Sequence, residues 1–143
     1  MSSELILESH QIHSEEERCR LSGPGLRAFL VISGRLDLNA SQRIAVLGAP
    51  SASTYYRWIR KAQRKEELTL SVDTLMRVSA LLGIYKAMVE LLPNESEALT
   101  WLHGPHTGQL FSGRSPVELM QDSSFEGIKS VRTYLDDWLG RRS

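Results

Sequence analysis

The segment from Ser71 to Leu92 constrains the fold most, because its apolar residues recur at the three- and four-residue spacing of one α-helix face. Pro93-Asn94 follows directly and is expected to end that helix. The residues on the apolar face are Leu75, Val78, Leu82, Tyr85, Val89 and Leu92. The sequence therefore predicts its longest helix here, opened by Ser71.

Strand signals are almost absent from the rest of the chain, and only residues 26–32 are ambiguous between a strand and a helix. We interpret them as a helix that Pro24 or Gly25 opens and that Ser33-Gly34 closes. The other predicted helices lie at 40–47 behind the cap Asn39, from Ser51 or Ser53 to about 65, at 95–102, from Ser115-Pro116 onward, and at about 124–139. The sequence therefore predicts an all-α fold.

The chain has 143 residues, of which 41% are apolar and 24% charged, and this is enough for a buried core in one or two small units. No apolar run approaches the ~18–20 residues that a membrane-spanning helix needs, and the acidic start of the chain lacks an export signal. Cys19 is the only cysteine, which excludes an intrachain disulfide and any multi-cysteine metal site. We therefore expect a cytoplasmic protein with no membrane partner.

A soft boundary is expected between Pro93 and Gly113, where a proline, glycines and histidines interrupt the helical patterns. It divides the chain into an N-terminal extension at 1–24, whose order the sequence leaves open, a first helical module at 25–93 and a second one at 94–143.

The net charge of zero hides an uneven distribution along the chain. Residues 21–67 carry eight basic and three acidic residues. By contrast, residues 1–20 carry five acidic and two basic residues, and residues 86–127 carry six acidic and two basic ones. A basic block between acidic flanks is typical of a DNA-contacting face, although chance also produces such blocks.

The basic block contains the pattern of a helix-turn-helix: a short helix that Leu47-Gly48 ends, a turn, and a second helix with polar residues at its N-terminus. The second helix has an apolar face formed by Tyr55, Trp58, Ile59 and Ala62. Its remaining surface is cationic, and arginine matches phosphate and guanine edges through its planar donors. The candidate DNA-binding residues are Ser51, Ser53, Thr54, Arg57, Arg60, Lys61 and Arg64. A solvated amphipathic helix that binds no DNA is the alternative.

No pattern of catalytic or metal-binding residues stands out. His103 and His106 lie on a loop that does not place both rings on one helix face, and no paired carboxylates, phosphate-binding glycine loop or nucleophile motif accompanies them. His10 and His13 complete the histidines of the chain. We therefore expect no enzyme activity, no cofactor and no metal site.

Two sets of motifs resemble the Xre/MbcA/ParS antitoxins. The first resembles their Xre-like helix-turn-helix and consists of Leu47-Gly48, Thr54-Tyr55-Tyr56-Arg57-Trp58, Leu70-Ser71-Val72-Asp73 and Arg77. The second resembles their C-terminal toxin-binding region and consists of Trp101-Leu102, Pro105-His106, Phe111-Ser112-Gly113-Arg114-Ser115-Pro116, Glu118-Leu119, Gly127 and Val131-x-x-x-Leu135. The glycine-x-serine-proline element is the most specific part.

This resemblance implies a type II antitoxin whose usual partner is a RES-domain toxin, an enzyme of ADP-ribosyltransferase type that consumes or transfers from NAD. The antitoxin would cover the toxin's active site, and the complex would repress its own operon. The alternative function is a stand-alone helix-turn-helix transcriptional regulator whose C-terminal helical domain senses a ligand or partner.

The candidate toxin-binding residues are Phe111, Gly113, Arg114, Ser115, Pro116, Glu118, Trp138, Arg141 and Arg142. Gly113 permits a positive φ and Ser115 offers a capping oxygen, so starting a helix is the alternative role of this element. Trp101 and Phe111 are expected in the core more than in a contact surface, whereas Trp138 suits either place.

Two further expectations concern assembly and inhibition. We expect a homodimer, because one helix-turn-helix buries too little DNA surface for tight specific binding, and residues 26–32 are the expected pairing surface. At the C-terminus, Gly140 is expected to end the last helix and to let Arg141-Arg142-Ser143 turn into the toxin's active site. A solvated terminus that touches nothing is the alternative.

Overall fold

The structure is a computed structural model of the chain, and it describes residues 14–142. The described residues form seven helices and no strand, which confirms the predicted all-α fold. In chain order the helices are α1 (Glu15–Arg35), α2 (Ala40–Val46), α3 (Ala52–Gln63), α4 (Val72–Leu91), α5 (Glu95–His103), α6 (Pro116–Met120) and α7 (Phe125–Arg142).

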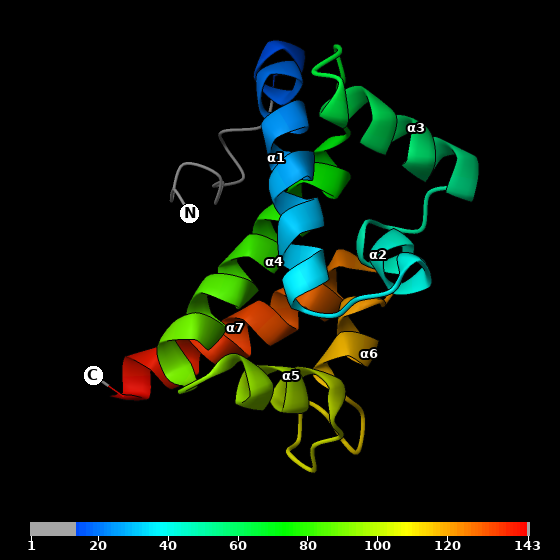
Figure 1. Cartoon of the computed structure of the whole chain (residues 1–143). Coiled ribbons are helices and arrows are strands. Elements are labelled where there is room, and N and C mark those ends of the chain that lie inside the picture. The colour runs from blue at the N-terminus through cyan, green and yellow to red at the C-terminus, as the bar shows by residue number, and fades with distance from the viewer. Residues whose placement is uncertain (1–13, 143) are drawn as a thin grey trace.

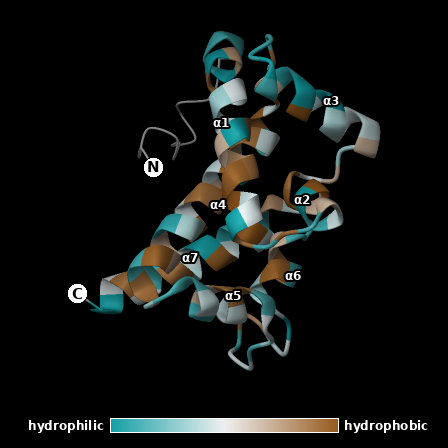
Figure 2. Cartoon of the chain, in the orientation of Figure 1, coloured by the Kyte–Doolittle hydropathy of each residue, from teal (hydrophilic) through white to brown (hydrophobic). Residues whose placement is uncertain are grey.

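Helix α4 lies at the centre of the fold and packs against α1, α5 and α7 (Figure 1). Its residues are buried almost all round, not only on the single face that the periodicity predicted. Ala80, Ile84 and Ala87, on the opposite side, are at most 2% exposed, whereas Val89, on the predicted face, is 60% exposed. A helix that is apolar on several sides suits such a central position, and the apolar colouring of α4 reflects it (Figure 2).

Helix α1 begins at Glu15, which corrects the predicted start near Pro24. Ser14 caps the helix, because its Oγ accepts a 3.0 Å hydrogen bond from the backbone N–H of Glu17. Pro24 lies inside the helix, where a proline normally breaks the backbone hydrogen-bonding pattern. The helix persists because one face is buried, through Leu21, Leu26, Phe29 and Ile32. Residues 15–24 therefore belong to the folded body and not to the N-terminal extension expected at 1–24.

The segments 25–93 and 94–143 share one hydrophobic core. Helix α7 packs along α4, and its buried residues Ile128, Val131 and Leu135 belong to this core. The predicted boundary near residues 93–113 thus divides the sequence but does not separate two independent cores. The two segments share this core because α4 supplies packing surface to both of them.

Candidate functional site

The turn between α2 and α3 has the backbone that a helix-turn-helix needs. Asn39 opens α2 with a reciprocal capping box, in which its side chain and that of Gln42 each accept a hydrogen bond from the other residue's backbone N–H. Gly48 has a φ of +96° and Ala49 a φ of +61°, so two successive residues with positive φ reverse the chain. Of the two predicted caps, Ser51 and Ser53, it is Ser51 that caps α3, by accepting a hydrogen bond from the backbone N–H of Thr54 at 3.2 Å.

Helix α3 packs inward through the apolar face that the sequence predicted. Tyr55 and Ala62 are buried, and Trp58 and Ile59 pack partly buried against the core. Burial raises the pKa of Tyr55 above its ordinary value. A 2.7 Å hydrogen bond from Arg27 Nη1 to the Ala62 carbonyl holds the end of α3 on α1. The outward face of α3 is therefore fixed by packing on its inner side.

The outward face of α3 is polar and cationic. Its exposed cations are Arg57, Arg60 and Arg64, whereas Lys61 is half-buried. Of the predicted polar N-terminal residues, Ser53 is exposed and Thr54 half-buried; the exposed hydroxyl of Ser51 is engaged in capping. The sequence reasoning missed Tyr56, which is 49% exposed. The sequence did offer a signal: Tyr56 is three residues after Ser53 and four before Arg60, a spacing that places all three on one helix face.

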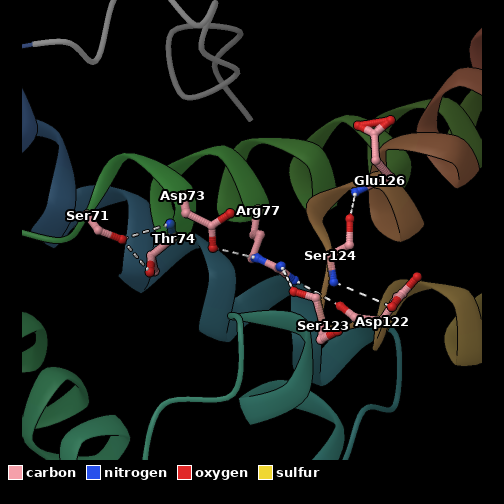
Figure 3. Close-up of polar contacts among 8 residues, drawn as sticks. All are labelled: Ser71, Asp73, Thr74, Arg77, Asp122, Ser123, Ser124 and Glu126. Atoms are coloured by element: carbon pink, nitrogen blue, oxygen red, sulfur yellow. Dashed lines mark hydrogen bonds and ion pairs between the residues drawn. The ribbon is translucent and has the colours of Figure 1, made fainter.

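A buried arginine, Arg77 of α4, joins the helix-turn-helix to the segment between α6 and α7 (Figure 3). Its side chain is 2% exposed. Its Nε donates to Asp73 Oδ2 at 2.9 Å, and Nη1 and Nη2 donate to the backbone carbonyls of Asp122 at 3.3 Å and Ser123 at 2.6 Å. A Cβ at Gly48 would lie 3.2 Å from Arg77 Nε, so the turn packs closely on the guanidinium. The sequence offered Arg77 only as part of a motif and gave no sign of these contacts.

The loop between α5 and α6 is closed at its base by backbone hydrogen bonds. The N–H of Gly113 donates to the His106 carbonyl at 2.7 Å, and the N–H of His106 donates to the Arg114 carbonyl at 3.2 Å. Gly113 has the predicted positive φ, at +89°. Ser115 then opens α6 through a capping box with Glu118, whose carboxylate accepts from the Ser115 N–H at 3.0 Å. The predicted capping role is confirmed.

An aromatic cluster packs between this loop and helices α5 and α7. Its rings come from α5, the loop and α7, with neighbouring centroids 5.0–6.3 Å apart. The members are Trp101, His106, Phe111, Tyr134 and Trp138. The ring of His106 also donates from Nε2 to the Trp101 carbonyl at 2.7 Å. As expected, Phe111 is a core residue, and Trp101 and Trp138 are partly buried.

The structure brings together only part of the predicted toxin-binding set. Gly113, Arg114 and Glu118 are exposed beside one another at the start of α6, whereas Phe111, Ser115 and Pro116 are buried beneath them. Arg141 and Arg142 lie in the last turn of α7, away from the start of α6 (Figure 1). Helix α7 is about 27 Å long at 1.5 Å per residue.

The C-terminal tail does not turn away at Gly140. Helix α7 continues through Gly140 to Arg142, which corrects the predicted helix end. A Cβ at Gly140 would meet no heavy atom within 4 Å apart from its chain neighbours and the backbone of α7 itself, so this glycine serves no close approach to another element. Arg142 Nη1 donates to the Glu90 carbonyl at 2.5 Å and holds the end of α7 on α4.

Only His106 lies on the α5–α6 loop, because His103 is the last residue of α5, which corrects the expected loop position of both histidines; each has a structural partner. His103 donates from Nε2 to the Leu36 carbonyl at 2.8 Å, while His106 binds the Trp101 carbonyl. Within residues 14–142 no group of three histidine, cysteine or acidic residues is placed to hold a metal ion, and His10 and His13 lie outside the described residues. No described helix is both long and apolar enough to span a membrane.

The fold and these surfaces define a helix-turn-helix protein with a C-terminal helical region built on the same core. The family model described as "Antitoxin Xre-like helix-turn-helix domain" matches residues 20–83. The one described as "Antitoxin Xre/MbcA/ParS C-terminal toxin-binding domain" matches residues 87–141.

A relative from Sinorhizobium fredii (strain NBRC 101917 / NGR234), named uncharacterized protein y4oB, is 36% identical over 111 residues, which cover 78% of this chain and 81% of that protein. The chain belongs to the Xre/MbcA/ParS antitoxin family, with a DNA-binding helix-turn-helix domain followed by a toxin-binding domain.

Proposed function

We propose that the chain neutralises a RES-domain toxin, an NAD-consuming enzyme of ADP-ribosyltransferase type, by covering its active site. The observation that carries this proposal is the exposed cation Arg114 on a loop whose backbone is closed by hydrogen bonds to His106. A loop fixed before binding loses little conformational entropy when it docks.

The chemistry of Arg114 suits such a target. Within residues 14–142 its guanidinium makes no hydrogen bond or ion pair, so its donors are available to a partner. An NAD-consuming site binds a pyrophosphate and commonly uses an acidic residue, and a guanidinium pairs with a carboxylate through two parallel hydrogen bonds. Arg114 would therefore occupy the acidic part of the toxin's site, with Gly113 and Glu118 beside it at the interface.

The test is co-expression with a RES-domain protein encoded in the neighbouring reading frame, followed by measurement of NAD turnover by the purified complex. The wild-type chain should abolish NAD turnover by the toxin. Arg114→Glu should raise the dissociation constant of the toxin–antitoxin complex by about tenfold or more. Arg20→Glu makes the same charge change on α1 and should inhibit like wild type. A neighbouring reading frame that encodes another kind of toxin would overturn the RES-domain assignment. Full toxin affinity in Arg114→Glu would overturn the role given to Arg114.

We also propose that the chain represses its own operon as a homodimer. The cationic outward face of α3 supports this role, because guanidinium groups bind phosphates and guanine edges. Two copies related by a two-fold axis would read two half-sites in the promoter. Fluorescence anisotropy with DNA from the operon's promoter tests this: binding should be saturable, and unrelated DNA of equal length should bind at least tenfold more weakly at the same salt concentration.

A further inference from the structure

Two exposed valines mark an apolar surface that the fold leaves uncovered. Val31 on α1 is 55% exposed and Val89 on α4 is 60% exposed. The two helices pack side by side (Figure 1). Both valines line one groove of about 370 Å³ between them. The same groove includes Ile32, Leu82 and Tyr85. Contiguous exposed apolar residues of this kind are typical of a protein–protein contact, whereas single exposed ones are common.

A hydrogen bond between the two helices holds the groove in shape. Arg35 Nη1 donates to the Tyr85 hydroxyl at 2.9 Å and fixes α1 against α4 along the groove. Next to it, beyond Tyr85 and Val89, lies a second hollow of about 270 Å³ that Met88, Leu92 and Ala98 help to line. The apolar surface thus continues from α1 across α4 towards α5.

The charges around this surface are of both signs. Lys86 and Glu90 flank Val89 on the same face of α4 and also line the groove. Within residues 14–142 neither side chain makes a hydrogen bond or an ion pair. A partner that covers Val89 gains ion pairs when it offers a negative group to Lys86 and a positive group to Glu90.

We infer that this surface, centred on Val89, binds a second copy of the chain through an antiparallel two-fold pairing of α4 helices. In a two-fold interface, if residue i contacts residue j, residue j also contacts residue i. An axis level with Met88 places Lys86 of each copy opposite Glu90 of its partner, so both ion pairs form at once. The surface is complementary to itself, which favours a second copy over the toxin or DNA as the occupant.

This assignment replaces residues 26–32 as the expected pairing surface. Leu26, Phe29 and Ile32 are buried within the chain's own core, and Val31 is the large exposed apolar residue of that stretch. The inference rests on the proposed function only for the homodimer, whose interface it specifies. It requires neither a RES-domain toxin nor a particular operator.

The test is sedimentation equilibrium of the full chain with variants that leave the core intact. Wild type should be a dimer at micromolar concentration, and Val89→Asp should raise the dimer dissociation constant at least about tenfold, because it places a charge in an apolar contact. Circular dichroism should show unchanged helix content, since Val89 is exposed. A monomeric wild type, or a folded Val89→Asp that dimerises like wild type, would overturn the inference.

Charge exchange tests the pairing itself. Lys86→Glu and Glu90→Lys alone should each weaken the dimer several-fold, because each places like charges opposite one another. The double variant should recover an affinity within about twofold of wild type, since both ion pairs form again in reverse. Lys129→Glu on α7, whose partner Glu126 lies in its own chain, is the control and should leave the dimer unchanged. Failure of the double variant to recover would exclude the antiparallel register.

Toxin and DNA binding separate this inference from the proposed function. Val89→Asp should bind the toxin like wild type but bind promoter DNA more weakly. If the wild-type chain is monomeric and Val89→Asp loses the toxin, the surface belongs to the toxin and the inference is wrong. If wild type is a dimer through Val89 but binds no promoter DNA, the proposed repression fails while the interface stands.

Discussion

Arg77 donates a 2.6 Å hydrogen bond from Nη2 to the backbone carbonyl of Ser123, and this bond ties the DNA-binding domain to the start of α7. The guanidinium satisfies a second carbonyl in the same segment, that of Asp122, and pairs with Asp73 at the N-terminal end of α4. Because Gly48 also packs against this side chain, one buried charge positions both the helix-turn-helix turn and the segment that precedes α7.

Replacing Arg77 by methionine should lower the free energy of unfolding by about 2–4 kcal/mol, because it leaves two carbonyls without donors and removes a buried ion-pair partner. Asp73→Asn should cost at most about 1 kcal/mol, since the Asp73 side chain is 57% exposed and water replaces its contact. Urea unfolding followed by circular dichroism measures both values. Equal losses in the two variants would contradict the central role assigned to the guanidinium.

Gly127 has a steric role that Gly113 lacks. A Cβ at Gly127 would lie 2.2 Å from the Leu119 carbonyl oxygen, so alanine there should push α7 away from α6 and cost about 2–3 kcal/mol. A Cβ at Gly113 would meet nothing within 4 Å, and only its φ of +89° opposes alanine, at a cost of roughly 1 kcal/mol. In thermal unfolding, Gly127→Ala should lose more stability than Gly113→Ala. A larger loss in Gly113→Ala would refute the steric role of Gly127.

The local parts of the fold were predictable from the sequence. Asn39, Ser51, Ser71 and Ser115 all cap helices as expected, because a capping oxygen acts on a backbone N–H only three residues away. The positive φ of Gly113 followed in the same way from its place before a helix start. The exposure of Arg57 and Arg60 followed from the periodicity of α3.

The errors share a different cause, because each depends on contacts between distant residues. Pro24 falsely marked the start of α1, since buried side chains elsewhere along the helix hold it together. Gly140 falsely marked the end of α7, where Arg142 reaches α4. No local pattern indicates that Arg77 is buried or that Val89 is exposed, because both follow from the way other helices cover α4.

The cations on the outward face of α3 should determine promoter affinity. Arg57→Ala and Arg60→Ala should each weaken binding by about 1–3 kcal/mol if the side chain reaches a base, and should lower the salt slope by about one if it contacts a phosphate. Lys129→Ala on α7, where Lys129 pairs with Glu126 of its own helix, should leave both quantities unchanged. Anisotropy titrations at several salt concentrations distinguish these outcomes. Full affinity in the Arg57/Arg60 double variant would exclude α3 as the DNA-contacting helix.

Deleting Arg141–Ser143 should leave toxin inhibition intact. Helix α7 continues through Gly140, and Arg142 is engaged with the Glu90 carbonyl, so the described part of the tail lies along the body of the protein. The deletion removes one exposed hydrogen bond and should lower the free energy of unfolding by no more than about 1 kcal/mol. Residual NAD turnover by the toxin at saturating antitoxin, measured beside the binding affinity, is the decisive readout. Relief of inhibition without loss of binding would mean that the tail enters the active site and must leave α4 to do so.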